Sequence, residues 1–275
     1  MGTQFTSRLT PADRKKIVNG IEDALSDLVP SRKTRASADK GKAGTRTAGG
    51  PKPRPRPDAK AISELSRGQL RQLSDVAIGQ VMTVVEARGL FTVFEGRSIF
   101  EDILKWLKEI RNDAEFNGFK GIIKRYGMEE SMNPVRDLTS QLTEIAEKAK
   151  LDPFRVAATT AAKAILAETV TRNVTPISGE SQAQRYGRKL ATLTLYDLVR
   201  RYINAFVFEV ISRAVSMADP HGAAKIIRAT IPEIQKTTER IARKAVDQIK
   251  REGKLCNVER TQQIVSDGLR TYVSL

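Results

Sequence analysis

The sequence predicts an all-α fold, with a two-lobed helical core and an N-terminal helical arm on a flexible basic linker. Three observations lead to this prediction. Apolar residues recur at helical spacing through most of the chain, prolines follow capping residues at several helix starts, and residues 31–60 lack large apolar side chains. The only strand-like run, residues 90–94, is short. We therefore expect helices almost throughout.

The first element is an arm helix within residues 1–30. Thr10 precedes Pro11, which places a capping hydroxyl before a proline at the first helical position. One apolar stripe follows at helical period, formed by Ile17, Ile21, Leu25 and Leu28. A lone helix cannot bury such a stripe by itself. We expect it to dock on the body or on another copy of the chain, and we assign these four residues to oligomerisation.

Residues 31–60 form the predicted linker. They contain ten Lys and Arg against two Asp, a net charge of +8, and no Val, Leu, Phe, Trp or Tyr. Such a composition cannot bury enough apolar surface to offset the entropy of ordering, so we expect a flexible, disordered segment. Thirty flexible residues span roughly 30 Å, enough to reach an adjacent protomer.

Residues 61–178 are predicted to form a helical N-lobe. Helices are expected near residues 66–88, 98–110, 116–126, 134–150 and 153–173. Asn133-Pro134 and Asp152-Pro153 mark two of the starts, and Ser98 with Glu101 reads as a capping box. Glycines stand where helices should stop, at Gly89, Gly127 and, further along the chain, Gly253.

Residues 179–275 are predicted to form a helical C-lobe, separated from the N-lobe by the loop at residues 174–184. Its helices are expected near residues 186–217, 220–230, 232–252 and 258–273. The 186–217 segment is apolar around much of its circumference, which is typical of a helix in the middle of a domain.

Several function classes are disfavoured. Cys256 is the only cysteine and His221 the only histidine, so neither a disulfide within one chain nor a zinc cluster can form. The sequence also lacks a phosphate loop, a dinucleotide fingerprint and a nucleophile elbow. We expect no enzymatic activity, no metal and no cofactor. With neither an apolar run near 18 residues nor a signal peptide, we expect no membrane span and an intracellular setting.

The charge predicts a polyanionic partner. The whole chain carries +15, so a large excess remains outside the linker. Basic residues interleaved with aromatic rings suit single-stranded RNA, because cations follow the phosphates and rings stack on bases without reading sequence. The candidate RNA-binding residues are Lys120, Lys124, Arg125, Tyr126, Arg155, Lys163, Arg185, Tyr186, Arg188, Lys189, Arg200, Arg201 and Tyr202.

Two segments resemble nucleocapsid proteins of phlebovirus-type segmented negative-strand RNA viruses. Residues 155–179 read RVAATTAAKAILAETVTRNVTPISG, a helix that ends in a proline, an aliphatic residue, a hydroxyl residue and glycine. Residues 126–139 give a second similar stretch, with Tyr-Gly-Met followed by Asn-Pro-Val-Arg-Asp-Leu-Thr. The resemblance implies a two-lobed helical core that holds single-stranded RNA in a basic groove. It also implies an arm that reaches the neighbouring subunit, in virion ribonucleoproteins and the host cytoplasm.

A second resemblance is to coat proteins of flexible filamentous plant viruses of the potyvirus type, whose fold is related. It is carried by Phe154-Arg155, Arg172-Asn173, Arg185-Tyr186-Gly187 and Arg201-Tyr202. One alternative interpretation is therefore a coat protein of a flexible filamentous positive-strand RNA virus. Another is a cellular helical adaptor whose basic tail touches nucleic acid or anionic membrane.

Overall fold

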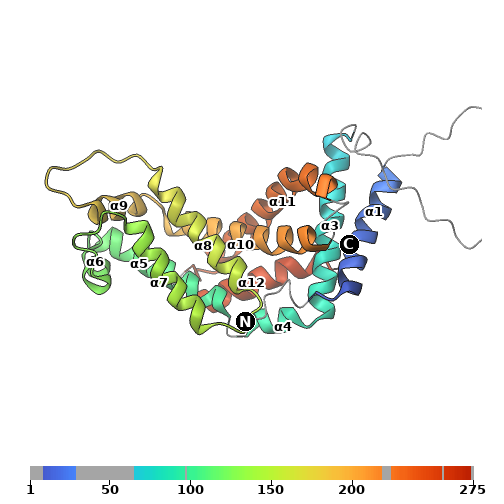
Figure 1. Ribbon diagram of the computed structural model, residues 1–275, viewed down its shortest axis with the longest axis horizontal. Coiled ribbons are helices and arrows are strands. Elements are labelled where there is room, and N and C mark those ends of the chain that lie inside the picture. The colour runs from blue at the N-terminus through green and yellow to red at the C-terminus, as the bar shows by residue number, and fades with distance from the viewer. Residues whose placement is uncertain (1–8, 29–64, 97, 219–223, 256, 274–275) are drawn as a thin grey trace, which may run out of the picture.

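The computed structural model describes residues 9–28, 65–96, 98–218, 224–255 and 257–273, and its architecture is shown in Figure 1. These residues form helices and loops without a strand, so the all-α prediction is confirmed. The helices in chain order are α1 (Pro11–Leu28), α3 (Arg67–Ala87), α4 (Leu90–Glu95), α5 (Ile99–Phe116), α6 (Lys120–Tyr126), α7 (Pro134–Lys148), α8 (Arg155–Val170), α9 (Gln182–Ala191), α10 (Leu195–Ala218), α11 (Ala224–Arg251) and α12 (Val258–Arg270).

Local capping explains most helix boundaries. The side chain of Asn133 accepts a hydrogen bond from the backbone N–H of Arg136, with Pro134 at the first helical position of α7. The predicted stop signals are confirmed, because Gly89, Gly127 and Gly253 all adopt left-handed backbone conformations that favour glycine.

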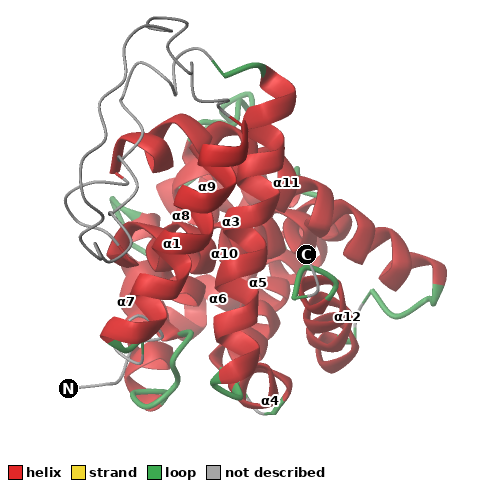
Figure 2. Cartoon of the chain, turned by 90° about the vertical axis from the view of Figure 1, so that its right-hand side faces the viewer, coloured by secondary structure: helices red, strands yellow, loops and turns green. Residues whose placement is uncertain are grey.

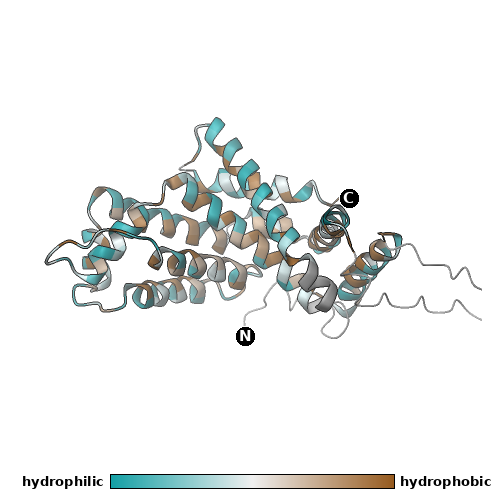
Figure 3. Ribbon diagram, turned by 90° about the horizontal axis from the view of Figure 1, so that it is seen from above, coloured by the Kyte–Doolittle hydropathy of each residue, from teal (hydrophilic) through white to brown (hydrophobic). Residues whose placement is uncertain are grey.

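The helix α10 is the centre of the core. It packs against α1, α3, α5, α8 and α11, and the apolar faces of the helices turn inward (Figure 3). Its aromatic side chains Tyr202 and Phe206 meet Phe94, Phe100 and Phe154 in one buried cluster, with ring centroids 5.0 Å apart for Phe100 and Tyr202. The expectation of a central helix in this part of the sequence is therefore confirmed for residues 195–218.

Residues 90–94, the strand-like run, form helix α4 in agreement with the all-α prediction, and Leu90, Phe91 and Phe94 are buried in the core. Two boundary predictions were wrong. The single helix expected at residues 186–217 is two helices, α9 and α10, which break between them at residues 192–194. The two helices expected at residues 220–230 and 232–252 are one helix, α11, which continues through Pro232.

The capping box expected at Ser98 is also absent. Ser98 precedes α5 but its hydroxyl donates to Gln262 Oε1, and the side chain of Asp152 accepts the bond from the Ile99 backbone N–H at 2.7 Å. The same carboxylate accepts the backbone N–H of Phe154, so α8 begins two residues after Pro153. A residue distant in sequence thus supplies the cap of α5.

The arm helix α1 lies on its own chain. Figure 2 shows α1 beside α3, and the contacts extend to α10. Ile17, Ile21 and Leu25 are buried there and Leu28 is half-buried. The predicted apolar stripe is therefore a docking surface. Its role in oligomerisation stays a prediction.

The linker at residues 31–60 lies outside the described residues. One hydrophobic cluster contains residues from both sides of the predicted lobe boundary, and the division into lobes stays a prediction. Among the described helices, none alone is long and apolar enough to cross a bilayer. The segments Arg67–Ala87 and Leu90–Phe116 reach that length and apolar character only together, as a pair bent by 80°.

Candidate nucleic-acid interface

A small pocket beside α9 brings cations and apolar side chains together. The capping box formed by Ser181 and Gln184 fixes the start of α9, so that Arg185 and Lys189 lie one turn apart on the same face. The pocket has a volume of about 280 Å³ between the start of α7, the end of α8 and α9. Its lining comprises Met132, Asn133, Pro134, Val135, Val170, Gln182, Arg185, Tyr186 and Lys189.

Two cations that line this pocket, Arg185 and Lys189, and a third at the end of α9, Arg172, make no ion pair with a carboxylate among the described residues. The Nε atom of Arg185 is buried without a hydrogen-bond acceptor. Lys189 donates to the carbonyl oxygen of Val170, and Arg172 donates to the hydroxyl of Thr192 at 3.0 Å, one turn beyond Lys189. These are weak partners for full positive charges. The group, which we call the α9 cation group (Arg172, Arg185 and Lys189), is therefore available to an external anion.

Apolar side chains border the same cations. Met132 is 84% exposed and Val170 is 47% exposed, although large apolar side chains usually turn inward. Both line the pocket with Arg185 and Lys189. An apolar wall next to unpaired cations can accommodate a base and its phosphate at once.

Arg188 has a different role from its neighbours. Its guanidinium binds both carboxylate oxygens of Glu180 and the carbonyl oxygen of Thr175. The hydrogen bond from Arg188 holds the pKa of the Glu180 carboxyl below its ordinary value. Arg188 thus ties the loop at residues 171–181, the arch in Figure 1, to α9 and is already occupied.

The predicted residues on α6 lie at the same end of the molecule, because α6 packs against α9 (Figure 1). Lys120 and Lys124 are exposed and make no ion pair among the described residues. Arg125 is paired with Glu109, and the half-buried Tyr126 accepts a hydrogen bond from the Trp106 indole N–H at 3.3 Å. The structure therefore leaves two lysines of α6, a helix that packs against α9, without an ion pair among the described residues.

The predicted arginines of α8 and α10 are mostly committed to carboxylates. Arg155 is 3.6 Å from Glu147, whereas Lys163 is exposed and has no ion pair in the described part of the chain. Arg200 pairs with Asp197 and Glu239, and Arg201 pairs with Glu168. The ion pair of Arg200 with Glu239 connects α10 to α11, and that of Arg201 with Glu168 connects α10 to α8. Their pairing explains why two charges fit next to apolar residues.

Two predicted stacking rings require correction. Tyr202 is fully buried and its hydroxyl donates to the carbonyl oxygen of Phe100 at 3.2 Å; Tyr186 is 4% exposed and its hydroxyl donates to Leu166. Burial raises the pKa of both phenols, so they remain neutral donors. A base cannot stack on a ring that has no open face. Both tyrosines are core residues.

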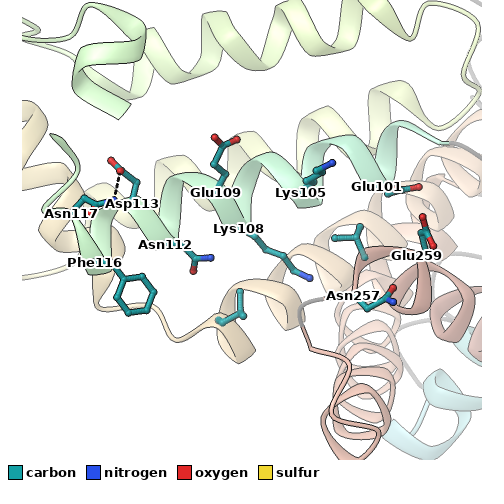
Figure 4. Close-up of a pocket in the computed structure, with 12 residues that line it drawn as sticks. Glu101, Lys105, Lys108, Glu109, Asn112, Asp113, Phe116, Asn117, Asn257 and Glu259 are labelled. Carbon is teal, nitrogen blue, oxygen red and sulfur yellow. Dashed lines mark hydrogen bonds between the residues drawn. The ribbon is translucent and has the colours of Figure 1, made fainter. Parts of the chain in front are cut away.

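Two larger pockets are not basic surfaces. The first, about 690 Å³ and shown in Figure 4, is lined by four carboxylate residues and two lysines on α5 and at the start of α12. Of these lysines, Lys108 is buried and donates to the Leu255 carbonyl. The second, about 810 Å³, lies near the junction of α7 and α8 and has mixed charge. Neither suits a polyanion.

Sequence reasoning missed Arg172 and Met132 as members of the site. Arg172 follows the Ala-rich helix in the segment that carries the first resemblance, so the sequence did contain a signal for it. The sequence contains no signal that Met132 would be exposed.

The described residues contain no group of three His, Cys, Asp or Glu side chains that could hold a metal ion. Comparisons with protein families, curated proteins and solved structures find no match.

Proposed function

We propose that this chain is a nucleoprotein that encapsidates single-stranded RNA largely independently of sequence and polymerises through its N-terminal helix. The α9 cation group carries the proposal, because its three cations make no ion pair in the described structure and two of them, Arg185 and Lys189, border an exposed apolar wall. Cations bind phosphates of any sequence, and apolar surface accepts any base. The chain acts by binding and needs no catalytic residue.

The position of α1 supports polymerisation. Gln69 of α3 donates to the carbonyl oxygen of Leu28 at 2.8 Å, so the end of α1 lies against the start of α3. Helix–helix connections in bundles usually take about 2–8 residues, whereas residues 29–64 join these two ends. The extra length is unnecessary for docking on the same chain and gives the helix reach to dock on a neighbour. Exchange of α1 between copies would link subunits along RNA.

The resemblance to phlebovirus-type nucleocapsid proteins adds independent support, since one of the segments that carry it, residues 155–179, contains Arg172 of the α9 cation group. On this proposal the protein belongs to the virion ribonucleoprotein and the host cell cytoplasm. Its partners are single-stranded RNA and further copies of itself.

The test is electron microscopy of the full chain purified at moderate salt, before and after ribonuclease, with the bound nucleic acid extracted and typed. We expect rings or filaments with protected RNA. A protein free of nucleic acid that stays monomeric when RNA is added would refute the proposal and favour the adaptor.

A matched pair of variants locates the site. Arg185→Gln/Lys189→Gln should lower the slope of log affinity against log salt by about 1.4, because each lost phosphate contact on a single strand contributes about 0.7. Lys105→Gln/Lys148→Gln removes the same charge from exposed positions on α5 and α7 and should leave the slope unchanged. Equal slopes for the two variants would exclude the α9 cation group as the interface.

A further inference from the structure

A second pocket with basic and aromatic lining lies between α11 and α12, away from α9 (Figure 1). It has a volume of about 270 Å³. Its floor is apolar, from Ile241, Ala245 and Ile264, and Gly268 leaves space because a Cβ there would meet only Ile241, at 3.9 Å. Arg240, Lys244 and Tyr272 stand at its edge, with Gln248, Asp267 and Thr271 completing the lining.

The cations at this pocket lack carboxylate partners. Arg240 and Lys244 lie one turn apart on α11 and make no ion pair among the described residues, whereas the flanking Arg243 and Lys236 are both paired. Asp267, the one carboxylate in the lining, accepts a hydrogen bond from Gln263 at 3.1 Å. The lining therefore carries a net positive charge with an apolar floor.

Tyr272 is the aromatic ring that this pocket exposes. It is half-buried, in contrast to the buried Tyr186 and Tyr202. Burial raises the pKa of its phenol, so the hydroxyl stays protonated. The charges of Arg240 and of Arg71 on α3 act to lower the pKa of this phenol, and that of Asp75 on α3 acts to raise it. Asp75 is held by the hydroxyl of Thr237.

We infer that this pocket, the Tyr272 pocket, is a second contact for single-stranded RNA that holds one nucleotide, with the base on Tyr272 and the phosphate on Arg240 and Lys244. The inference rests on the proposed function for its ligand class. A volume below the ~300–1,000 Å³ of typical small-molecule pockets suits one nucleotide unit. The carboxylates of an acidic peptide would contact the cations but not the ring, whereas a nucleotide contacts the cations with its phosphate and the ring with its base.

The test uses the RNA-stripped full chain with a thiouridine-labelled oligouridylate. After irradiation, cross-linked peptides are mapped by mass spectrometry, and affinity is followed by fluorescence anisotropy of the same oligonucleotide. We expect cross-links on the peptide that contains Tyr272. Tyr272→Phe should retain affinity because it keeps the ring. Tyr272→Leu, which keeps apolar packing without a ring, should lower affinity by about 5- to 150-fold, the range for losing one stacked base.

Two further variants separate this site from the α9 cation group. Arg240→Gln/Lys244→Gln should lower the salt slope by about 1.4, with Lys105→Gln/Lys148→Gln as the charge-matched control. Wild-type affinity in Tyr272→Leu and Arg240→Gln/Lys244→Gln, with loss in Arg185→Gln/Lys189→Gln, would overturn the Tyr272 pocket and leave the proposed function standing. Loss only in Arg240→Gln/Lys244→Gln would indicate a general anion surface and overturn the nucleotide site. Absence of any RNA binding by the wild type would overturn both proposals.

Discussion

The length of chain between α1 and α3 gives the sharpest test of polymerisation by arm exchange. The two helices form an antiparallel pair that is tied at both ends. At one end, Gln69 of α3 donates to the last carbonyl oxygen of α1. At the other end, Arg88 after α3 donates to Thr10 and Asp13 at the start of α1. Deletion of residues 31–60 leaves six residues, 29–30 and 61–64, between the helices. We expect this variant to fold as a monomer with α1 docked on its own α3.

The expected magnitude follows from reach. Six residues extend to at most roughly 20 Å, and the ends that they join are already in hydrogen-bond contact. A flexible chain of the same length as residues 29–64 would have a root-mean-square span of roughly 30–36 Å. The short connection satisfies docking within one chain and is too short to bridge to a neighbour. Its stability should equal or exceed that of the wild type, because closing a shorter loop costs less entropy.

The assay is light scattering coupled to size-exclusion chromatography, with and without RNA, and thermal melting as a check of folding. A second variant with residues 31–60 replaced by a Gly/Ser sequence of equal length keeps the reach and removes the net charge of +8. We expect this control to assemble on RNA and the deletion to stay monomeric. Full-size assemblies from the deletion variant would refute arm exchange. Loss of assembly in both variants would show that the linker charge is required.

Three further predictions concern packing and charge. Gly187→Ala should destabilise the fold by about 1–3 kcal/mol in thermal melts, because a Cβ there would lie 2.4 Å from Phe119 Cβ. Tyr202→Phe should cost about 1 kcal/mol of unfolding free energy from the lost hydrogen bond and leave RNA affinity unchanged. The Arg260 hydrogen bond lowers the pKa of Glu252 to about 2. Denaturant unfolding should therefore show Glu252→Gln less stable than wild type above pH 4.5, with the difference vanishing as the pH falls through 2.

Each of these has a control and a contrary outcome. Gly68→Ala, in the exposed first turn of α3 where the nearest atom is 3.9 Å away, should be neutral, and equal melting temperatures for the two glycine variants would contradict the packing argument. Weaker RNA binding by Tyr202→Phe would indicate that Tyr202 takes part in the RNA interface. A stability difference for Glu252→Gln that stays constant down to pH 2 would show that its effect is not electrostatic.

The sequence predicted the helices well where the signals are local. Asn133-Pro134 and the glycine stops depend on a few adjacent residues, and the structure agrees. The break between α9 and α10 was missed because the apolar pattern continues across it. A local signal was present, since Thr194 and Asp197 cap α10 by mutual hydrogen bonds. The cap that Asp152 supplies to Ile99 spans 53 residues and has no local signal.

The candidate interface was less predictable because free charge is a property of the folded chain. Arg201 and Arg185 are indistinguishable as sequence letters in basic stretches. Folding places Glu168 beside Arg201, 33 residues away in the sequence. Arg185 makes no ion pair among the described residues, and Glu180, the carboxylate on which its charge acts, is already bound by Arg188. Likewise, spacing does not show that Tyr202 enters the core while Tyr272 stays at a pocket edge. The sequence predicts the class of partner, and pairing decides which cations serve it.

Arm exchange has a consequence for how assembly is controlled. The helix α1 buries the same apolar stripe on α3 whether both belong to one chain or to two, so those contacts largely cancel between monomer and oligomer. What remains is the entropy of the linker and the free energy of binding RNA. The linker entropy favours docking within one chain, because its ends are already in contact there. RNA that occupies neighbouring subunits raises the effective concentration of each α3 near the next α1. Assembly should therefore follow RNA occupancy, and stripping the RNA at high salt should return the protein to a closed monomer.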